Sequence, residues 1–254
     1  MKTRMKTTLK TRIGSAALPW LAAAALPVQA GDIVGGSALL DAGRQAQLER
    51  WLGAGEFNLT NVYTHWVGDT SADFHAGADA QGPTFTLLDV TNKAGASYLV
   101  GGYNPQPWAA DEAWHETPRD WQRTAFLFNM TDPAVYRQVL SGYILPSQGL
   151  RQTFNDTGFG PVFGAGPDLF VNKELTAAIS WQLSYGNPAN EGLSIIDDSV
   201  GGQLVRLDAL EVFSISPVPE PAPAAMLLGG IGMLAWLGRK HGVLRQAKWM
   251  PGAS

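Results

Sequence analysis

Two apolar runs separated by a polar turn dominate the hydrophobic pattern in the middle of the chain. The runs cover residues 84–90 and 98–103, and the segment between them, TNKAGAS, is rich in turn formers. This pattern predicts a β-hairpin with a long loop. The second run contains Gly101 and Gly102, which allow another part of the backbone to approach closely. We expect both glycines to have a structural role.

Two short helices are predicted before this hairpin. Ser37 is the expected N-cap of a helix that runs to residue 52, and Gly53 is its expected C-cap. Thr70 and Asp73 have the spacing of a capping box, with Asp in the place of Glu, and predict a second helix.

Short β-branched and aromatic segments recur over the rest of the chain. Further strands are predicted at 62–67, 124–130, 132–140, 168–171, 178–184, 193–196 and 204–215. In 124–130, Phe126, Phe128 and Met130 alternate with polar or smaller residues and share one face. Many short strands and few helices predict a mainly β fold, specifically a two-sheet antiparallel β-sandwich.

The glycine-rich segment 158–166, GFGPVFGAG, raises the question of a phosphate-binding loop. Its spacing matches neither G-x-G-x-x-G nor the P-loop pattern, and no Lys-Ser or Lys-Thr follows it. We therefore interpret it as a turn-forming loop.

Residues 1–30 have the features of a secretory signal peptide. Five basic residues precede an apolar stretch, and a small-x-small pattern ends at Ala30, the predicted site of signal peptidase cleavage. The alternative is a permanent N-terminal anchor. The stretch is shorter than the ~20 apolar residues that a span requires, and Pro19 and Pro27 interrupt it.

The C-terminal region contains three segments of different character. Residues 217–221 form a proline-rich linker, 222–238 form an uncharged apolar stretch, and 239–254 form a basic tail. A helix over the apolar stretch would be about 25 Å long, which is a minimal transmembrane helix. Arg239 and Lys240 close it, so the tail is predicted to be cytoplasmic. A buried core helix is the weaker alternative because the stretch has no polar face.

Charge is segregated along the chain. Of the 18 Lys and Arg residues, five lie in residues 1–12 and four lie beyond Gly238, which leaves nine against all 22 Asp and Glu residues. The intervening chain therefore has a net charge of −13. Such an acidic domain repels phosphate backbones, so nucleic-acid binding is not expected. The absence of cysteine excludes disulfides and thiolate chemistry.

Glu211 interrupts an apolar strand pattern. It shares a predicted strand face with Ala209, Phe213 and Ile215. A carboxylate in such a place needs hydrogen-bond partners. Our interpretation is a structural carboxylate satisfied by backbone amides or an arginine, and the alternative is a general acid–base.

Histidines and carboxylates cluster in sequence around the second predicted helix. His65, Asp69, Asp73 and His75 are residue types that bind metals, but their spacing is unspecific and Asp73 is explained by capping. We predict no metal site and no cofactor. No nucleophile elbow occurs, and we assign no catalytic residue.

The C-terminal order of parts resembles the PEP-CTERM sorting signal of bacteria that make exopolysaccharide. The matching residues are Pro219, Glu220 and Pro221, then the apolar helix, then Arg239 and Lys240. The resemblance implies processing by an exosortase. It also implies an inner-membrane intermediate that is later attached to the cell surface or released outside the cell.

The middle of the chain resembles the TLDc domain, and a bacterial TLD-type group with this sorting signal in particular. The matching pieces are 73–90, 100–108, 124–130, 159–171 and 207–215. They fall within a predicted domain over residues 31–216. The resemblance implies a β-sandwich of two antiparallel sheets with helices at the edges. It implies no catalytic residues.

Our leading hypothesis is an exported, non-enzymatic domain that acts by binding in the envelope or extracellular matrix. The predicted contact residues are Trp108, Trp114 and Trp121, with exopolysaccharide as the candidate ligand, because aromatic rings suit the apolar faces of sugars. The alternatives are an adhesive matrix component without a saturable ligand and a secreted enzyme. The enzyme would be a hydrolase or an oxidative-stress protein with an unidentified acid–base site.

Overall fold

The computed structural model describes residues 31–142, 148–218, 229–234 and 236. The predicted cleavage site at Ala30, the motif residues Pro219, Glu220 and Pro221, and the basic pair Arg239 and Lys240 lie outside these residues.

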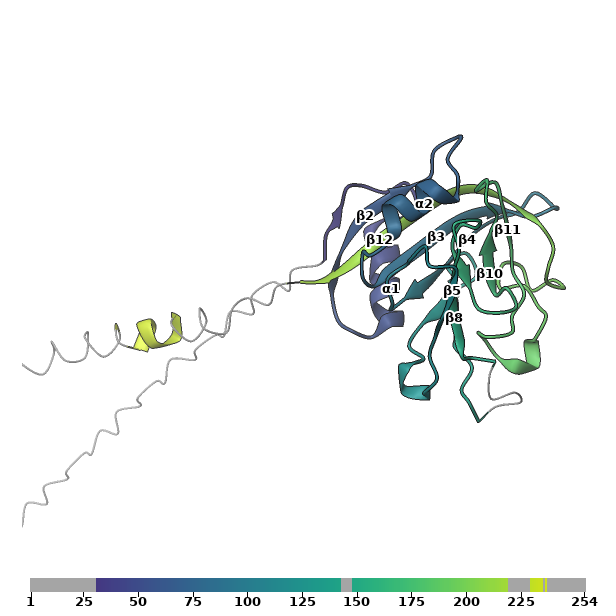
Figure 1. Ribbon diagram of the computed structural model, residues 1–254. Coiled ribbons are helices and arrows are strands. Elements are labelled where there is room, and N and C mark those ends of the chain that lie inside the picture. The colour runs from purple at the N-terminus through teal and green to yellow at the C-terminus, as the bar shows by residue number, and fades with distance from the viewer. Residues whose placement is uncertain (1–30, 143–147, 219–228, 235, 237–254) are drawn as a thin grey trace, which may run out of the picture.

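The described chain is mainly β, and twelve strands share one hydrogen-bonded sheet (Figure 1). The strands are β1 (Ile33–Val34), β2 (Phe57–Thr64), β3 (Thr84–Thr91), β4 (Ser97–Asn104), β5 (Ala113–Glu116), β6 (Phe126–Asn129), β7 (Ala134–Arg137), β8 (Arg151–Asn155), β9 (Val162–Phe163), β10 (Leu169–Val171), β11 (Ala177–Ile179) and β12 (Val205–Pro217). The helices are α1 (Ala42–Leu52) and α2 (Ser71–Ala78), with two 3-10 turns, η1 (Asp120–Gln122) and η2 (Pro188–Asn190). The strand order is β5-β8-β9-β10-β11-β12-β3-β4-β6-β7, and β2 joins it through β12. All the pairs are antiparallel except β1 with β2.

The sheet branches at β12. On one side β12 pairs with β3, from Arg206 to Ser214. On the other side its first residues pair with β11, whereas residues 211–217 pair with β2. The last strand in sequence is therefore the centre of the sheet, and the two branches diverge between residues 206 and 211.

The central strands bury both of their faces. One face carries Phe85, Phe126 and Phe213 and packs against Leu48 of α1. The other face, with Leu88, Leu127 and Val212 among its residues, belongs to a cluster shared with α2 and with strands β9, β10 and β11. The predicted alternation within 124–130 is confirmed, because Phe126 and Phe128 lie in one cluster and Leu127 lies in the other.

The predicted hairpin is confirmed as β3 and β4, which pair along their whole length. Its two glycines lie where no side chain fits. A Cβ atom on Gly101 would lie 2.1 Å from the carbonyl oxygen of Thr86, and one on Gly102 would lie 2.6 Å from the ring of Phe163. Both glycines therefore allow neighbouring parts of the core to approach the strand.

The first helix begins later than predicted. Its N-cap is Asp41, whose Oδ1 accepts a hydrogen bond from the N–H of Arg44 at 2.8 Å. The Ser37 hydroxyl instead accepts the N–H of Leu40 at 2.7 Å, in a turn that precedes the helix. The predicted C-cap is confirmed, because Gly53 adopts the left-handed conformation with φ 70°.

The second helix is confirmed as α2, with Thr70 as its N-cap. The carboxylate of Asp73 accepts the backbone N–H of Thr70 at 2.8 Å. This bond lowers the pKa of Asp73 and accounts for the residue without a metal.

Several strand predictions need correction. The predicted strand 62–67 is β2, which ends at Thr64, because Asp69 accepts the N–H of Trp66 at 2.9 Å and turns the chain. The predicted strand 193–196 is only an isolated bridge between Leu193 and Val200. The turn and strand expected at 132–140 is confirmed as β7. Strands β1, β5, β8 and β9 were not expected.

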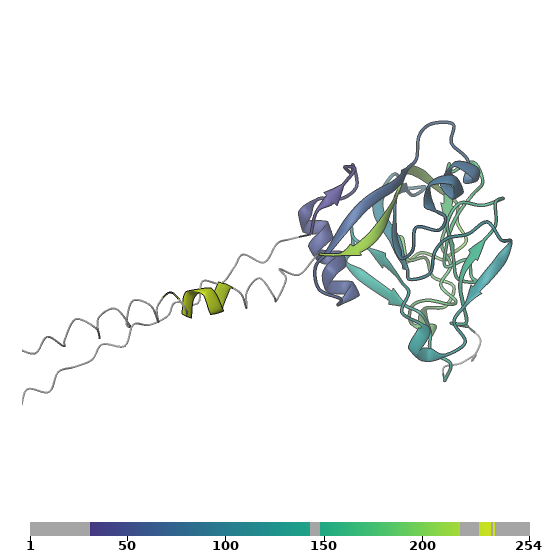
Figure 2. The same ribbon diagram turned by 60° about the vertical axis from the view of Figure 1, so that its left-hand side comes forward.

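Both ends of the described domain lie beside Phe57. Pro217 is the register partner of Phe57, and a Cβ atom on Gly31 would lie 1.9 Å from the carbonyl oxygen of Phe57. In both views the end of β12 lies across the molecule from the teal strands β5 and β8 (Figures 1 and 2).

No helix among the described residues is long and apolar enough to cross a membrane. Most of the predicted transmembrane stretch, 222–238, falls outside these residues.

Candidate functional site

Register partners across five strands form a continuous apolar row. Trp114 of β5 lies opposite Phe154 of β8, and Phe154 lies opposite Val162 of β9. Val162 in turn pairs with Phe170 of β10, and Phe170 pairs with Ile179 of β11. Residues directly opposite one another on antiparallel strands share one face of the sheet.

This row lies on the outer face of these strands. The neighbouring positions Phe163, Leu169 and Ala178 belong to the buried core cluster, so the alternate positions point away from it. Phe159, from the loop after β8, lies over the row and is 36% exposed. The row is therefore an aromatic surface that remains partly open to solvent.

We call Trp114, Phe154, Phe159 and Phe170 the aromatic face. Their ring centroids are 4.8 Å apart for Trp114 and Phe154, 6.5 Å for Phe154 and Phe159, and 5.2 Å for Phe159 and Phe170. The guanidinium of Arg151 lies 4.9 Å from the Trp114 ring centroid. These mutual contacts fix the orientation of the rings.

Only one of the three predicted contact tryptophans belongs to the aromatic face. Trp108 is 1% exposed, and its indole N–H donates to the hydroxyl of Thr84 at 3.0 Å. It is a core residue, so its prediction as a surface contact is wrong. Trp121 lies in η1 and is 72% exposed. Trp114 is half-buried in the row.

Glu211 is 2% exposed and lies under the turn that precedes α1. Its carboxylate accepts the N–H of Ala38 at 2.8 Å, the N–H of Leu39 at 3.4 Å and the hydroxyl of Ser37. These donors are the kind of partner that the structural interpretation requires, with backbone amides rather than an arginine. All three donors belong to the turn over residues 37–39, so the carboxylate holds this turn against β12.

The residues considered for metal binding do not converge on one point. Both ring nitrogens of His75 are engaged, Nδ1 with Asp79 at 2.9 Å and Nε2 with the carbonyl of Asp156 at 3.1 Å. Asp69 accepts the hydroxyl of Tyr63 and the N–H of Trp66. Within the described ranges, no group of three or more histidine and acidic side chains is arranged to hold a metal ion.

Asp168 is a buried carboxylate that the sequence pattern marked only as the start of a strand. Its Oδ1 accepts the N–H groups of Leu183, Ser184 and Tyr185 at 2.7 to 2.8 Å, and its Oδ2 accepts the N–H of Gly166 at 3.2 Å. Burial raises the pKa of Asp168 to about 6, against the opposing effect of these bonds. Asp168 therefore holds two loop segments in place, one at Gly166 and one at residues 183–185. In the sequence, the signal for this role was a single acidic residue directly before the apolar run 169–171.

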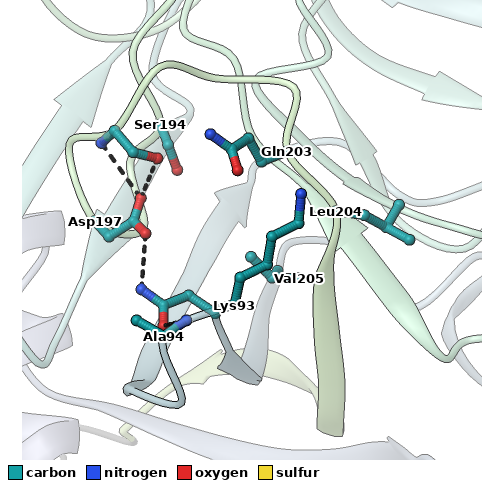
Figure 3. Close-up of a pocket in the computed structure, with 9 residues that line it drawn as sticks. Lys93, Ala94, Ser194, Asp197, Gln203, Leu204 and Val205 are labelled. Carbon is teal, nitrogen blue, oxygen red and sulfur yellow. Dashed lines mark hydrogen bonds between the residues drawn. The ribbon is translucent and has the colours of Figure 1, made fainter.

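A hollow of about 170 Å³ lies between the β3–β4 loop and residues 194–205. Figure 3 shows the side chains that line it. The Lys93 side chain extends into it, whereas Asp197 is held by Asn92 and Ser199. These hydrogen bonds lower the pKa of Asp197 although partial burial acts in the other direction. The hollow is small, and its carboxylate is already satisfied.

A second hollow, of about 320 Å³, contains Arg44 and Asp89. Burial, and secondarily the nearby Asp208, raises the pKa of Asp89. The pKa of Asp208 is lowered, against the effect of burial, by hydrogen bonds from Arg206 and Thr91. The pKa values of these two neighbouring acids are thus shifted in opposite directions.

The chain matches no protein-family model, and no curated protein matches it in sequence.

Proposed function

We propose that this protein is an exported, non-enzymatic binding domain whose aromatic face contacts a polysaccharide. The row of rings across β5, β8 and β10 is the observation that carries the proposal. Sugar rings have apolar C–H faces that pack on aromatic rings, and a row of rings on a sheet can follow several units of a polymer. Held in place by one another, the rings lose little conformational freedom on binding.

The charge of the domain restricts the kind of polymer. The chain between the two basic ends has a net charge of −13, and Arg151 is the cation that lies over the aromatic face. A strongly acidic protein repels an anionic polymer. The proposed ligand is therefore an uncharged polysaccharide.

The proposal includes a TLDc-like sandwich of two antiparallel sheets. Its support is the core cluster that the central strands share with β9, β10 and β11, since a buried layer common to two groups of strands is what a sandwich requires. The sequence pieces that resemble the TLDc domain correspond to β3, β4, β6, β10 and β12, all of which contribute to this core.

The proposal also includes the export route. Signal peptidase would cut after Ala30, and an exosortase would recognise Pro219, Glu220 and Pro221. The paired part of β12 ends at Pro217, so a cut at this motif would leave the central strand whole. Deletion of the exosortase followed by cell fractionation tests this route. A larger, membrane-bound form is expected, and an unchanged mature form would contradict it.

Binding is tested by comparing the Trp114→Ala and Trp121→Ala variants with the unmodified protein. Co-sedimentation measures the affinity of each protein for the uncharged polysaccharides of the extracellular matrix of the organism that produces it. Trp114→Ala should weaken binding about tenfold or more, because a stacked aromatic ring contributes about 1.5 kcal/mol. Trp121→Ala should bind normally. Equal affinities for all three proteins would refute the assignment of the aromatic face.

The pair Asp89 and Asp208 supports a second candidate function, that of a hydrolase. Neighbouring acids whose pKa values move apart can divide the roles of acid and base. If this site is catalytic, the unmodified protein releases reducing ends from the matrix polysaccharide and Asp89→Asn does not. Absence of release by the unmodified protein would remove this candidate.

A further inference from the structure

Trp181 lies two residues beyond the end of β11 and is 46% exposed. Ile179, the last register partner in the apolar row, precedes it on the same segment. The side chain between them, Ser180, points inward, because its hydroxyl donates to the carbonyl of Asp168 and accepts the N–H of the core residue Ile195. Side chains alternate along an extended segment, so Trp181 lies on the same outer face as Ile179 and the aromatic face.

Bare backbone supports the indole of Trp181 at both of its ends. A Cβ atom on Gly192 would lie 3.1 Å from the indole Nε1, and one on Gly202 would lie 3.6 Å from Cε3. Both glycines have positive φ, 85° and 78°, which is a conformation that residues with side chains rarely adopt. The ring is therefore seated against two turns, while nearly half of the residue stays open to solvent.

The backbone of Trp181 is also held in place. Its N–H donates to the carbonyl of Pro167 at 3.0 Å, and a Cβ atom on Gly166 would lie 2.0 Å from its carbonyl oxygen. Two residues further on, the N–H of Leu183 donates to the carboxylate of Asp168. A ring that is fixed before binding loses little conformational freedom when a ligand arrives.

The indole N–H of Trp181 has no hydrogen-bond partner among the residues that the structure describes. The open side of the residue therefore offers an apolar ring together with a free donor, a combination that suits the apolar face and the hydroxyl groups of a sugar. Residues 174–205, which include both supporting turns, contain four acidic residues and no Lys or Arg. This charge disfavours an anionic polymer here, as it does for the domain as a whole.

We call the aromatic face together with Ile179 and Trp181 the ring track. It crosses the outer face from β5 to β11, which are four strand-to-strand steps apart, or about 19 Å at ~4.8 Å per step. Trp114 lies at one end of the track and Trp181 at the other. Between them lie Phe154, Phe159, Phe170 and Ile179.

We infer that Trp181 is a second anchoring contact for the uncharged polysaccharide, at the end of the ring track opposite Trp114. This inference rests on the proposed function of the aromatic face. One sugar unit stacks on the open side of the indole, and the indole N–H donates to a hydroxyl of a neighbouring unit. Once the aromatic face holds one part of the polymer, the contact at Trp181 forms within the same complex and strengthens binding. The domain therefore selects long chains over short oligosaccharides.

The test is calorimetric titration of the full chain with oligomers of the neutral matrix polysaccharide, prepared by partial acid hydrolysis and separated by length. The affinity of the unmodified protein should rise with length and level off once an oligomer spans the ring track. Trp181→Ala should bind short oligomers normally and long ones about tenfold more weakly, because it loses one stacked ring. Trp181→Phe keeps a ring on the same backbone and should retain most of the preference for long oligomers.

Trp66→Ala is the matched control, because it removes an indole that is 71% exposed and lies after β2, away from the ring track. It should bind oligomers of every length as the unmodified protein does. Thermal melting checks that each variant is folded.

Unchanged affinity of Trp181→Ala for long oligomers would overturn the inference, and so would a loss of equal size at every length. Folded Trp181→Phe that binds long oligomers as weakly as Trp181→Ala would also contradict stacking. If Trp114→Ala weakens binding while Trp181→Ala does not, this inference fails and the proposed function stands. If neither variant weakens binding, both fail.

Discussion

The carboxylate of Glu211, in the central strand β12, accepts the backbone N–H of Ala38 at 2.8 Å. This bond ties the first turn of the domain to its last strand, 173 residues away in sequence. A buried carboxylate with these partners stabilises the fold, because its donors would otherwise be left unsatisfied.

Replacing Glu211 by Gln should therefore lower the free energy of unfolding by about 2 kcal/mol, because one acceptor oxygen becomes an N–H donor that faces other donors. Urea denaturation measures this change. Ser37→Ala removes a single hydroxyl from the same network and should cost less. An unchanged melting temperature in Glu211→Gln would contradict a structural role.

Gly102→Ala should destabilise the protein by about 1–3 kcal/mol, because the new methyl group would lie 2.6 Å from Phe163. Gly142→Ala is the matched control, since no atom of the described residues lies within 4 Å of its Cβ position and its φ lies outside the left-handed region. Thermal melting of the two variants measures the difference in their stability. Equal stability of the two variants would show that the core can move to accept a side chain at residue 102.

Asp168 should make stability depend on pH. Its pKa is about 6 in the folded protein against an ordinary value of 3.8 for an aspartate, so the folded state holds the proton more tightly. The stability that this group contributes is full below pH 3.8 and is lost as the pH rises through about 6. The total loss is about 3 kcal/mol.

Asp168→Asn isolates this effect, because the amide does not titrate. The difference in unfolding free energy, unmodified protein minus variant, should fall as the pH rises from about 4 to 7. Denaturation series at several pH values measure the difference. A difference that is constant or that rises with pH would contradict the assignment.

Trp108 should behave as a core residue and not as a ligand contact. Trp108→Phe loses the hydrogen bond to Thr84 and should cost about 1 kcal/mol, whereas Trp108→Ala should cost about 3–5 kcal/mol. Thermal melting shows which of the two variants is the less stable. Polysaccharide affinity of the folded Trp108→Phe variant should be unchanged, and a marked loss would restore the residue as a contact.

Local patterns predicted the parts of the fold that local contacts determine. The hairpin β3–β4 is adjacent in sequence, and Thr70 with Asp73 caps its helix over three residues, so both could be predicted. Strand β8, RQTFN, has little apolar character of its own and becomes a strand by pairing with β5 and β9. The local pattern also made Ser37 a plausible helix cap. Its hydroxyl donates to Glu211, which is far away in sequence, so a local pattern could not predict this bond.

The candidate site was harder to predict than the fold, because its residues come together only through pairing between segments that are distant in sequence. Trp114, Phe154 and Phe170 lie in three separate segments and form one surface only through the register of β5, β8, β9 and β10. The sequence grouped Trp108 with Trp114 and Trp121 in one tryptophan-rich segment, but the fold buries Trp108 against Phe74 and Phe163.

The most direct test of the central claim is an NMR titration of the ¹³C-labelled aromatic rings with an uncharged oligosaccharide from the host matrix. We predict that the largest shift changes occur at Trp114, Phe154, Phe159 and Phe170, with Trp108 and Trp121 nearly unaffected. Saturable changes confined to other rings, or none at concentrations that saturate binding, would contradict the assignment of the aromatic face.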